Sequence, residues 1–368
     1  MPATVPRRAP EPVHARLAAG LLEPAALAGL RLADWDALLP AARAAGLLAT
    51  LAERVAAAGL VERVPARARR HLEAARRFAA AQARAADDEL HRLATLLGRR
   101  GIEPVLLKGA AYLAAGLPCA EGRLMGDIDL LVPETRLAEA ELALKLAGWA
   151  PVKHDPYDQR YYRRWMHEIP PLRHVHRGSS IDLHHNILPR TSRARPQGAA
   201  LLEAAVAVPG RPGLRVLAPA DMVLHAAAHR FFDDGECDHA LRDLWDLHLL
   251  LGAFGGEPGF WDTLAARAAA FGLERPLAYA LRWCRRRFGT AVPAGTLAAV
   301  AAHLPPPPLG RIMDAVWERA LRPPHAACDD AWSGLARRAV YLRGHWLRMP
   351  PRLLLPHLAR KALVPRRA

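Results

Sequence analysis

The fold of this 368-residue chain is limited most by a change of sequence pattern after its first quarter. Residues 12–97 are rich in Ala, Leu and Arg and predict a run of helices. Two short apolar runs follow, 103–107 and 126–132, each bounded by Pro or Gly, and they predict buried strands. Helical segments at 109–116 and 134–147 come after these runs. Because strand and helix alternate here, the sequence predicts a compact α/β unit inside a largely helical chain.

Two expectations concern the N-terminal helices. Pro40 is expected to break the helical pattern, because proline removes a backbone donor. The last helix before the first strand is expected to begin at Asp87-Asp88-Glu89, since acidic side chains favour the positive N-terminal end of a helix, and to end at Gly98.

Three regions are predicted along the chain. Residues 1–89 form an N-terminal helical region, 90–195 an α/β core and 196–368 a C-terminal helical domain. Within the core, residues 173–184 predict a hairpin that adds antiparallel strands. The expected fold class is therefore α+β (mixed α/β), with a small mixed sheet flanked by helical regions.

Cationic residues are concentrated near the C-terminus. The chain carries 51 Lys and Arg against 36 Asp and Glu, a net charge of +15, and residues 275–368 alone contribute +13. Such a segment fits nucleic acid, an anionic surface such as lipid, or a polyphosphate-bearing substrate. A solvated helical surface in an arginine-rich protein explains the same charge.

Several features predict a cytoplasmic protein. The four cysteines are far apart and none forms a Cys-x-x-Cys pair, so neither a zinc knuckle nor a redox dithiol is indicated. The N-terminal residues lack the apolar segment of a signal peptide. No uncharged apolar run approaches the roughly 18 residues of a membrane span, so no transmembrane segment is expected.

The pair Asp127-x-Asp129 is the sharpest local candidate for chemistry. Along a strand, alternate side chains share a face, so both carboxylates project together while Ile128 and Leu130 point the other way. Two adjacent carboxylates repel each other unless a cation neutralises them, and they suit Mg²⁺ with a phosphate substrate. Two solvated acids at a strand end are the alternative.

Other residues complement this pair. Asp182, in Ile181-Asp182-Leu183-His184, is a third acid between apolar neighbours, either a further metal-binding carboxylate and proton acceptor or a hairpin charge. Lys108 and Gly109 follow a strand and begin a helix, where a lysine and close backbone approach suit phosphate. Arg123 either reaches a phosphate or forms a salt bridge.

The histidines allow two interpretations. His225 and His229 lie four positions apart on a predicted helix, as a zinc pair would, but no His-Glu-x-x-His is present and a packed helix face explains them better. His184 shares a strand face with Asp182, where it orients the acid, contacts substrate or has a structural role.

The blocks at 105–110, 123–132 and 181–184 together resemble those of a family of uncharacterised bacterial nucleotidyltransferases in the polymerase-beta-like superfamily. The resemblance implies transfer of a nucleoside monophosphate from an NTP such as ATP, with release of pyrophosphate. It implies Mg²⁺, or Mn²⁺ in its place, held by Asp127 and Asp129 with Asp182 as the third carboxylate. Lys108 and Gly109 would form the phosphate-binding turn, with Arg123 as a further nucleotide-binding residue.

The resemblance leaves the acceptor open. A protein hydroxyl, an RNA end, a sugar or another small molecule would all serve as the partner that receives the nucleotide. One departure concerns the turn: the wider superfamily has serine after the glycine, whereas this chain has Ala110. The alternative is therefore a catalytically degenerate nucleotidyltransferase-fold module that binds nucleotide, RNA or a protein partner.

Overall fold

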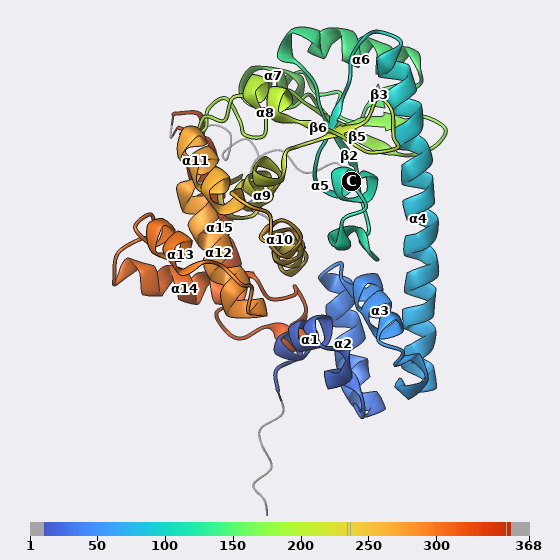
Figure 1. Ribbon diagram of the computed structural model, residues 1–368, viewed down its shortest axis with the longest axis vertical. Coiled ribbons are helices and arrows are strands. Elements are labelled where there is room, and N and C mark those ends of the chain that lie inside the picture. The colour runs from blue at the N-terminus through green and yellow to red at the C-terminus, as the bar shows by residue number, and fades with distance from the viewer. Residues whose placement is uncertain (1–10, 234, 236, 351, 355–368) are drawn as a thin grey trace, which may run out of the picture.

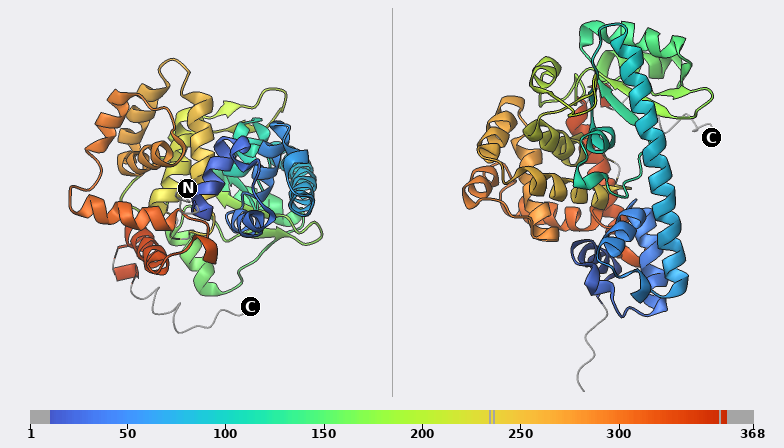
Figure 2. Two further views of the ribbon diagram at one scale, coloured as in Figure 1. Left: turned by 90° about the horizontal axis from the view of Figure 1, so that it is seen from below. Right: turned by 45° about the vertical axis from the view of Figure 1, so that its right-hand side comes forward.

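Figure 1 shows the computed structural model of the chain, which describes residues 11–350, except 234 and 236, and residues 352–354. The fold is α+β, as expected, with one mixed seven-stranded sheet and helices around it. The N-terminal helices lie at one end of the molecule and the sheet at the other, and the C-terminal helices lie beside them (Figures 1 and 2). Residues 355–368 of the predicted basic segment lie outside the described residues.

The N-terminal region is helical, but its predicted break at Pro40 is wrong. Its elements are α1 (Val13–Leu22), α2 (Leu32–Ala44) and α3 (Leu48–Ala57), with 3-10 turns at Pro24–Leu27 and Val61–Arg63. Pro40 lies inside α2, which continues across it. Leu38, Leu39 and Ala41 around it are buried, so packing outweighs the hydrogen bond that proline removes.

Helix α4 (Ala66–Gly98) is much longer than the sequence predicts and runs from the N-terminal helices to the sheet (Figure 1). The predicted helix start at Asp87 is therefore wrong, because the acidic run lies in the middle of α4. Its Glu89 is buried and accepts two hydrogen bonds of 2.7 Å from Arg177 in the β4–β5 turn. Glu89 therefore forms an ion pair with a distant segment and does not mark the start of a helix. Asp87 likewise pairs with Arg211.

The sheet has the order β3-β4-β5-β2-β1-β7-β6. Its strands are β1 (Val105–Leu106), β2 (Ile128–Leu131), β3 (Trp149–Pro151), β4 (Leu172–His174), β5 (Ser180–His184), β6 (Val206–Ala207) and β7 (Arg215–Val216). The two predicted strands and the hairpin are confirmed, while β3, β6 and β7 were not predicted. These three are two or three residues long, too short for a periodic pattern to form.

Helices surround the sheet and fill the rest of the chain. They are α5 (Lys108–Ala114), α6 (Leu137–Leu146), α7 (Pro156–Trp165), α8 (Gly198–Ala204), α9 (Pro219–Ala228), α10 (Ala240–Phe254), α11 (Phe260–Phe271), α12 (Glu274–Phe288), α13 (Ala294–Ala301), α14 (Leu309–Ala320) and α15 (Ser333–Arg348). A π-helical turn, His229–Asp233, follows α9, and 3-10 turns lie at Pro118–Ala120, Glu134–Arg136 and Ala326–Cys328. Among the described residues, no helix has both the length and the apolar character that a membrane crossing requires.

One hydrophobic core connects all these regions. Buried side chains from Leu17 in α1 through Leu130 in β2 to Val340 in α15 belong to a single cluster. Within it, Leu130 and Leu183 are fully buried on the neighbouring strands β2 and β5. Because side chains alternate along a strand, the opposite face of the same strands carries the acidic residues.

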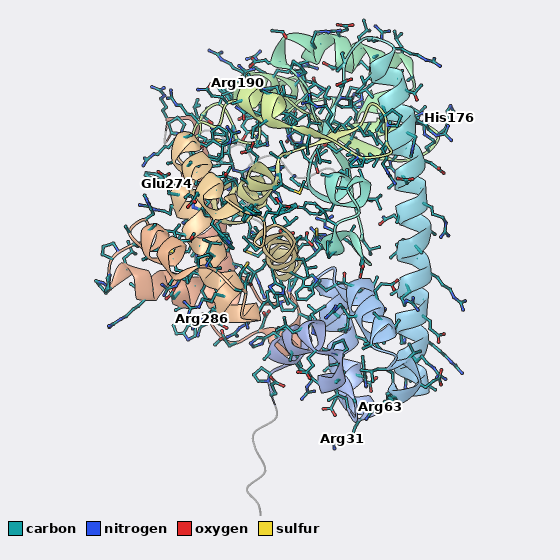
Figure 3. The ribbon with its side chains drawn as sticks, viewed as in Figure 1. Arg31, Arg63, His176, Arg190, Glu274 and Arg286 are labelled. Carbon is teal, nitrogen blue, oxygen red and sulfur yellow. The ribbon has the colours of Figure 1, made fainter. Side chains whose placement is uncertain are left out.

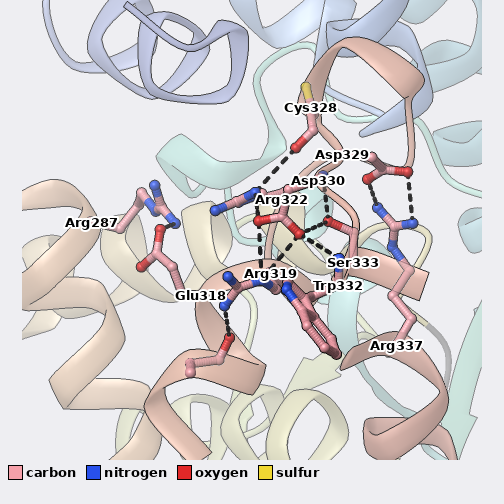
Figure 4. Close-up of polar contacts among 11 residues, drawn as sticks. Arg287, Glu318, Arg319, Arg322, Cys328, Asp329, Asp330, Trp332, Ser333 and Arg337 are labelled. Atoms are coloured by element: carbon pink, nitrogen blue, oxygen red, sulfur yellow. Dashed lines mark hydrogen bonds and ion pairs between the residues drawn. The ribbon is translucent and has the colours of Figure 1, made fainter. Parts of the chain in front are cut away.

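The positive charge of the C-terminal segment is partly neutralised by local ion pairs. Every acidic side chain in its described part pairs with arginine (several of these pairs appear in Figure 4). The pairs are Arg282–Asp314, Arg287–Glu318, Arg337–Asp329, and Arg319 and Arg322 with Asp330. Arginines outnumber these acids, and Arg286, labelled in Figure 3, shares Asp314 and Glu318 at 3.9 and 3.8 Å. Binding of nucleic acid or an anionic surface by this segment stays a prediction.

Gly122, in the loop before β2, packs closely against α3 of the N-terminal region. Gly122→Ala should therefore destabilise the protein. Its φ is +66°, and a Cβ would lie 2.6 Å from the backbone of Ala49 and Thr50 in α3. Backbone strain and overlap together should lower the free energy of unfolding by roughly 3 kcal/mol or more in urea denaturation. The control is Gly101→Ala, because Gly101 has a similar φ of +64° but open space around it. Equal losses in both variants would contradict the close packing at Gly122.

Candidate active site

The three predicted acids gather on one face of the sheet, at the neighbouring strands β2 and β5. Strands β2 and β5 are parallel neighbours, and their register places Asp129 directly opposite Asp182. Asp127 lies one residue before β2, and its charge contributes to the raised pKa of Asp182. The local alternation could be read from the sequence, but the contact between Asp182 and the other two acids depends on the pairing of β2 with β5.

Asp129 is the most tightly held of the three. It is buried, and its Oδ1 atom lies 3.0 Å from Lys108 Nζ and 3.0 Å from His184 Nε2. His184 Nε2 also lies 3.4 Å from an oxygen of Glu168. Lys108 begins α5 with a φ of +45°, a strained conformation for a residue other than glycine. A strained backbone here aims the lysine at the acids.

These contacts give the three carboxyl groups different pKa values. Burial tends to raise the pKa of Asp129, but Lys108 and His184 outweigh it and hold that pKa well below its usual range. Burial, together with the charges of Glu168, Asp129 and Asp127, raises the pKa of Asp182 to about 8. Burial and Asp129 also raise the pKa of Asp127, although Lys108 opposes them. Lys108 alone therefore does not balance the three carboxyl groups when all of them are ionised.

A cavity of about 380 Å³ opens beside the acids, between the core and the C-terminal helices. It is lined by α5, the loop before β2, the end of α9 and the start of α10. Its charged and imidazole side chains are Lys108, Arg123, Asp127, Asp129, His229, Asp238, His239, Arg242, Asp243 and Asp246. A cavity of this volume, with basic groups facing carboxylates, can hold a phosphorylated small molecule.

Arg123 and Gly109 line the same cavity and fit against each other. Arg123 donates through Nε to Asp246 Oδ2 at 2.8 Å, so the salt bridge that the sequence left open is present. A Cβ at Gly109 would overlap the Arg123 guanidinium, which explains glycine at this position. Ala110 beside it is 1% exposed and belongs to the apolar core. A serine hydroxyl there would point into the core and away from the cavity.

Sequence reasoning missed Glu168. It forms an isolated β-bridge with His184 and places a fourth carboxylate beside the cluster. No periodic pattern surrounds it, because it lies in a short segment between α7 and β4. Two further acids, Asp243 and Asp246 on α10, are also buried at the cavity.

His225 and His229 do not form a metal site in the described part of the chain, where the donor groups close enough to share a cation do not include them. His225 is buried, and burial with the nearby Lys108 charge holds its pKa well below 6.5. For His229, burial and Lys108 lower the pKa to about 3. Both are therefore neutral imidazoles packed beside the cavity at neutral pH.

These neutral histidines should make the protein sensitive to acid. In the unfolded chain these imidazoles bind protons near pH 6.5, whereas in the folded chain they do so only at much lower pH. The stability that the neutral imidazoles contribute is therefore complete above pH 6.5 and decreases as the pH falls below that value. Each can cost up to about 1.4 kcal/mol per pH unit. Between pH 7 and pH 5, the free energy of unfolding of His225→Gln should fall by about 2 kcal/mol less than that of wild type. The exposed His71→Gln is the control, and parallel profiles for all three proteins would contradict this account.

Several residues could hold a metal ion here. Asp129, Asp182 and His184 each offer a donor atom, and these atoms lie within 4.8 Å of one another. Asp127 adds a further carboxylate at the mouth of the cavity. Oxygen-rich groups of this kind are typical of Mg²⁺ and Mn²⁺ sites.

Comparison with known proteins identifies a family for the chain. No curated protein and no solved structure matches the chain. A family described as "Uncharacterised nucleotidyltransferase" matches residues 31–289, well over half of the chain. The matched segment includes the acids, the Lys108–Gly109 turn and the α10 side of the cavity. The chain therefore belongs to this nucleotidyltransferase family.

Proposed function

We propose that the protein is a Mg²⁺-dependent nucleotidyltransferase that moves a nucleoside monophosphate from an NTP to an acceptor and releases pyrophosphate. One observation carries this proposal. Asp127, Asp129 and Asp182 gather on one face of the neighbouring strands β2 and β5, and Asp127 and Asp129 line a cavity that Lys108 and Arg123 also line. Carboxylates and basic groups that line one cavity suit a metal–triphosphate substrate.

The acids fit a divalent cation. Their donor atoms are oxygens, which Mg²⁺ prefers, and the raised pKa of Asp182, caused by burial and by neighbouring carboxylates, reflects negative charge that Lys108 does not balance. Asp127, Asp129 and Asp182 would hold the ion. When bound, Mg²⁺ neutralises phosphate charge and lowers the barrier to attack on phosphorus.

The side chains of the site divide the remaining work. Lys108 and Arg123 bind and orient the phosphates of the nucleotide from one side. Asp182 accepts the proton of the acceptor hydroxyl as its oxygen forms a bond to the α-phosphorus. The bond from that phosphorus to the bridging oxygen breaks, and pyrophosphate leaves with the electron pair. Burial and Glu168 raise the pKa of Asp182 to about 8 in the metal-free chain, so Asp182 can accept this proton only above that pH or when a bound cation lowers its pKa.

Isothermal titration of ATP, GTP, CTP and UTP, with and without Mg²⁺, tests the nucleotide site. Wild type should bind at least one NTP only when Mg²⁺ is present, and Asp127→Asn should lose that binding. The matched control is Asp36→Asn, which changes an exposed acid on α2. NTP binding that does not depend on Mg²⁺ and is unchanged in Asp127→Asn would refute the metal–triphosphate site. Metal-dependent binding without turnover would instead favour the nucleotide-binding module.

A further inference from the structure

A cluster of nitrogen and oxygen donors lies beside the carboxylates, on β5 and on the segment between α7 and β4. His167, Glu168 and His184 each offer one donor atom, and these atoms lie within 4.8 Å of one another. His167 is 6% exposed and His184 is 1% exposed, while the Glu168 side chain is 15% exposed. The cluster is therefore enclosed, unlike a chance group of surface residues.

The backbone holds this cluster in place. The Ile169 N–H donates to the Leu183 carbonyl at 3.0 Å, and the His185 N–H donates to the His167 carbonyl at 2.9 Å. The β-bridge between Glu168 and His184 lies between these two hydrogen bonds. Donors on two paired segments are fixed relative to each other before any ligand binds.

Two imidazole nitrogens in the cluster lack partners. The Nδ1 atoms of His167 and His184 are buried and have no hydrogen-bond partner among the described residues. The two rings are 5.2 Å apart between centroids. A buried polar atom without a partner is costly, so two of them in one cluster of donors point to a ligand that would satisfy them.

The contacts of His184 favour a metal as that partner. Its Nε2 atom lies 3.0 Å from Asp129 Oδ1, and when it donates a proton there, Nδ1 carries the free lone pair. A histidine that donates one ring N–H to a carboxylate and offers its other nitrogen is the usual arrangement of metal-binding histidines. Glu168 supplies negative charge beside both rings.

We propose that His167, Glu168 and His184 form a second cation site that takes a divalent transition metal such as Mn²⁺, Co²⁺ or Zn²⁺. Imidazole nitrogens favour these ions over Mg²⁺, which prefers oxygen. The site differs from the one assigned to Asp127, Asp129 and Asp182 in its two imidazole donors, and His184 lies next to both sites because its Nε2 atom contacts Asp129. It needs no nucleotide, so it stands independently of the proposed reaction.

Titration of the metal-stripped full-length protein with Co²⁺, without nucleotide, tests this site. We expect one Co²⁺ per chain by elemental analysis, with visible absorption of nitrogen-ligated cobalt, in wild type and in Asp127→Asn. His167→Ala and the milder His167→Gln should weaken Co²⁺ binding at least tenfold. His176→Ala, which removes an exposed histidine in the β4–β5 turn, should bind as wild type does. Circular dichroism without metal verifies that each variant is folded.

The outcomes separate this inference from the nucleotide site. Mn²⁺ bound to wild type should also show nitrogen coupling in pulsed electron paramagnetic resonance, and this coupling should fall in the folded His167 variants. Unchanged Co²⁺ affinity in those variants, or bound Mn²⁺ without nitrogen coupling, would overturn the second site. Either result leaves Mg²⁺-dependent NTP binding untouched, and failure of NTP binding leaves the Co²⁺ result standing.

Discussion

Replacing Asp127 and Asp129 together by alanine is expected to slow nucleotidyl transfer by about 10³-fold or more. The two carboxylates supply most of the oxygen donors of the proposed Mg²⁺ site, and metal stabilisation of phosphoryl transfer is worth several kcal/mol, at about 1.4 kcal/mol per tenfold in rate. The measurement is pyrophosphate release, or incorporation of an α-phosphate label, over a panel of acceptors. A double variant that keeps the wild-type rate would exclude this mechanism.

The single variant Asp127→Asn separates lost chemistry from lost folding. Burial and Asp129 raise the pKa of Asp127, so its charge is disfavoured in the folded state. A neutral amide of the same shape should therefore leave the free energy of unfolding unchanged or slightly higher. Asp129→Asn should be less stable, because Lys108 and His184 then lose their partner. Urea unfolding without metal compares the two variants, with Asp36→Asn as the control.

Lys108→Met is expected to destabilise the protein and to weaken nucleotide binding. Burial alone would lower the pKa of Lys108, but Asp129, Asp127 and Glu168 raise it, so the ammonium ion is the counter-charge of the acids. Removing one partner of a buried ion pair costs 3–5 kcal/mol, and the Lys108 side chain is 23% exposed, so we expect about 2–3 kcal/mol. NTP affinity should fall at least tenfold, since the ammonium also lines the nucleotide cavity.

Added Mg²⁺ gives this prediction a specific signature. If the acids bind the ion, millimolar Mg²⁺ should restore part of the stability that Lys108→Met loses, because the cation replaces the missing positive charge. The control Lys145→Met removes a partly exposed lysine from Glu141, which is buried and keeps its partner Arg163, and it should cost about 0.5 kcal/mol with no response to Mg²⁺. Equal losses in both lysine variants, or a loss that Mg²⁺ does not reduce, would contradict the assigned role of Lys108.

The sequence alone could predict the local parts of the site. Alternation along a strand places Asp127 and Asp129 on one face, and this follows from a period of two residues without any tertiary contact. The strand–turn–helix pattern around Lys108 and the apolar setting of Asp182 are equally local. The same short-range signals predicted the α+β class, since helical and strand periods differ wherever a segment is long enough to show one.

Only the tertiary structure decided how these parts meet. Asp182 faces Asp129 because β5 pairs with β2 in parallel register, and Arg123 binds Asp246, 123 positions further along the chain. Glu168 joins the cluster through a single β-bridge, which no sequence pattern predicts. Helix α4 continues through its acidic run because Glu89 finds Arg177 across the fold. Contacts between distant segments depend on packing and burial. Local patterns in the sequence therefore identify the residues of the site but not their partners.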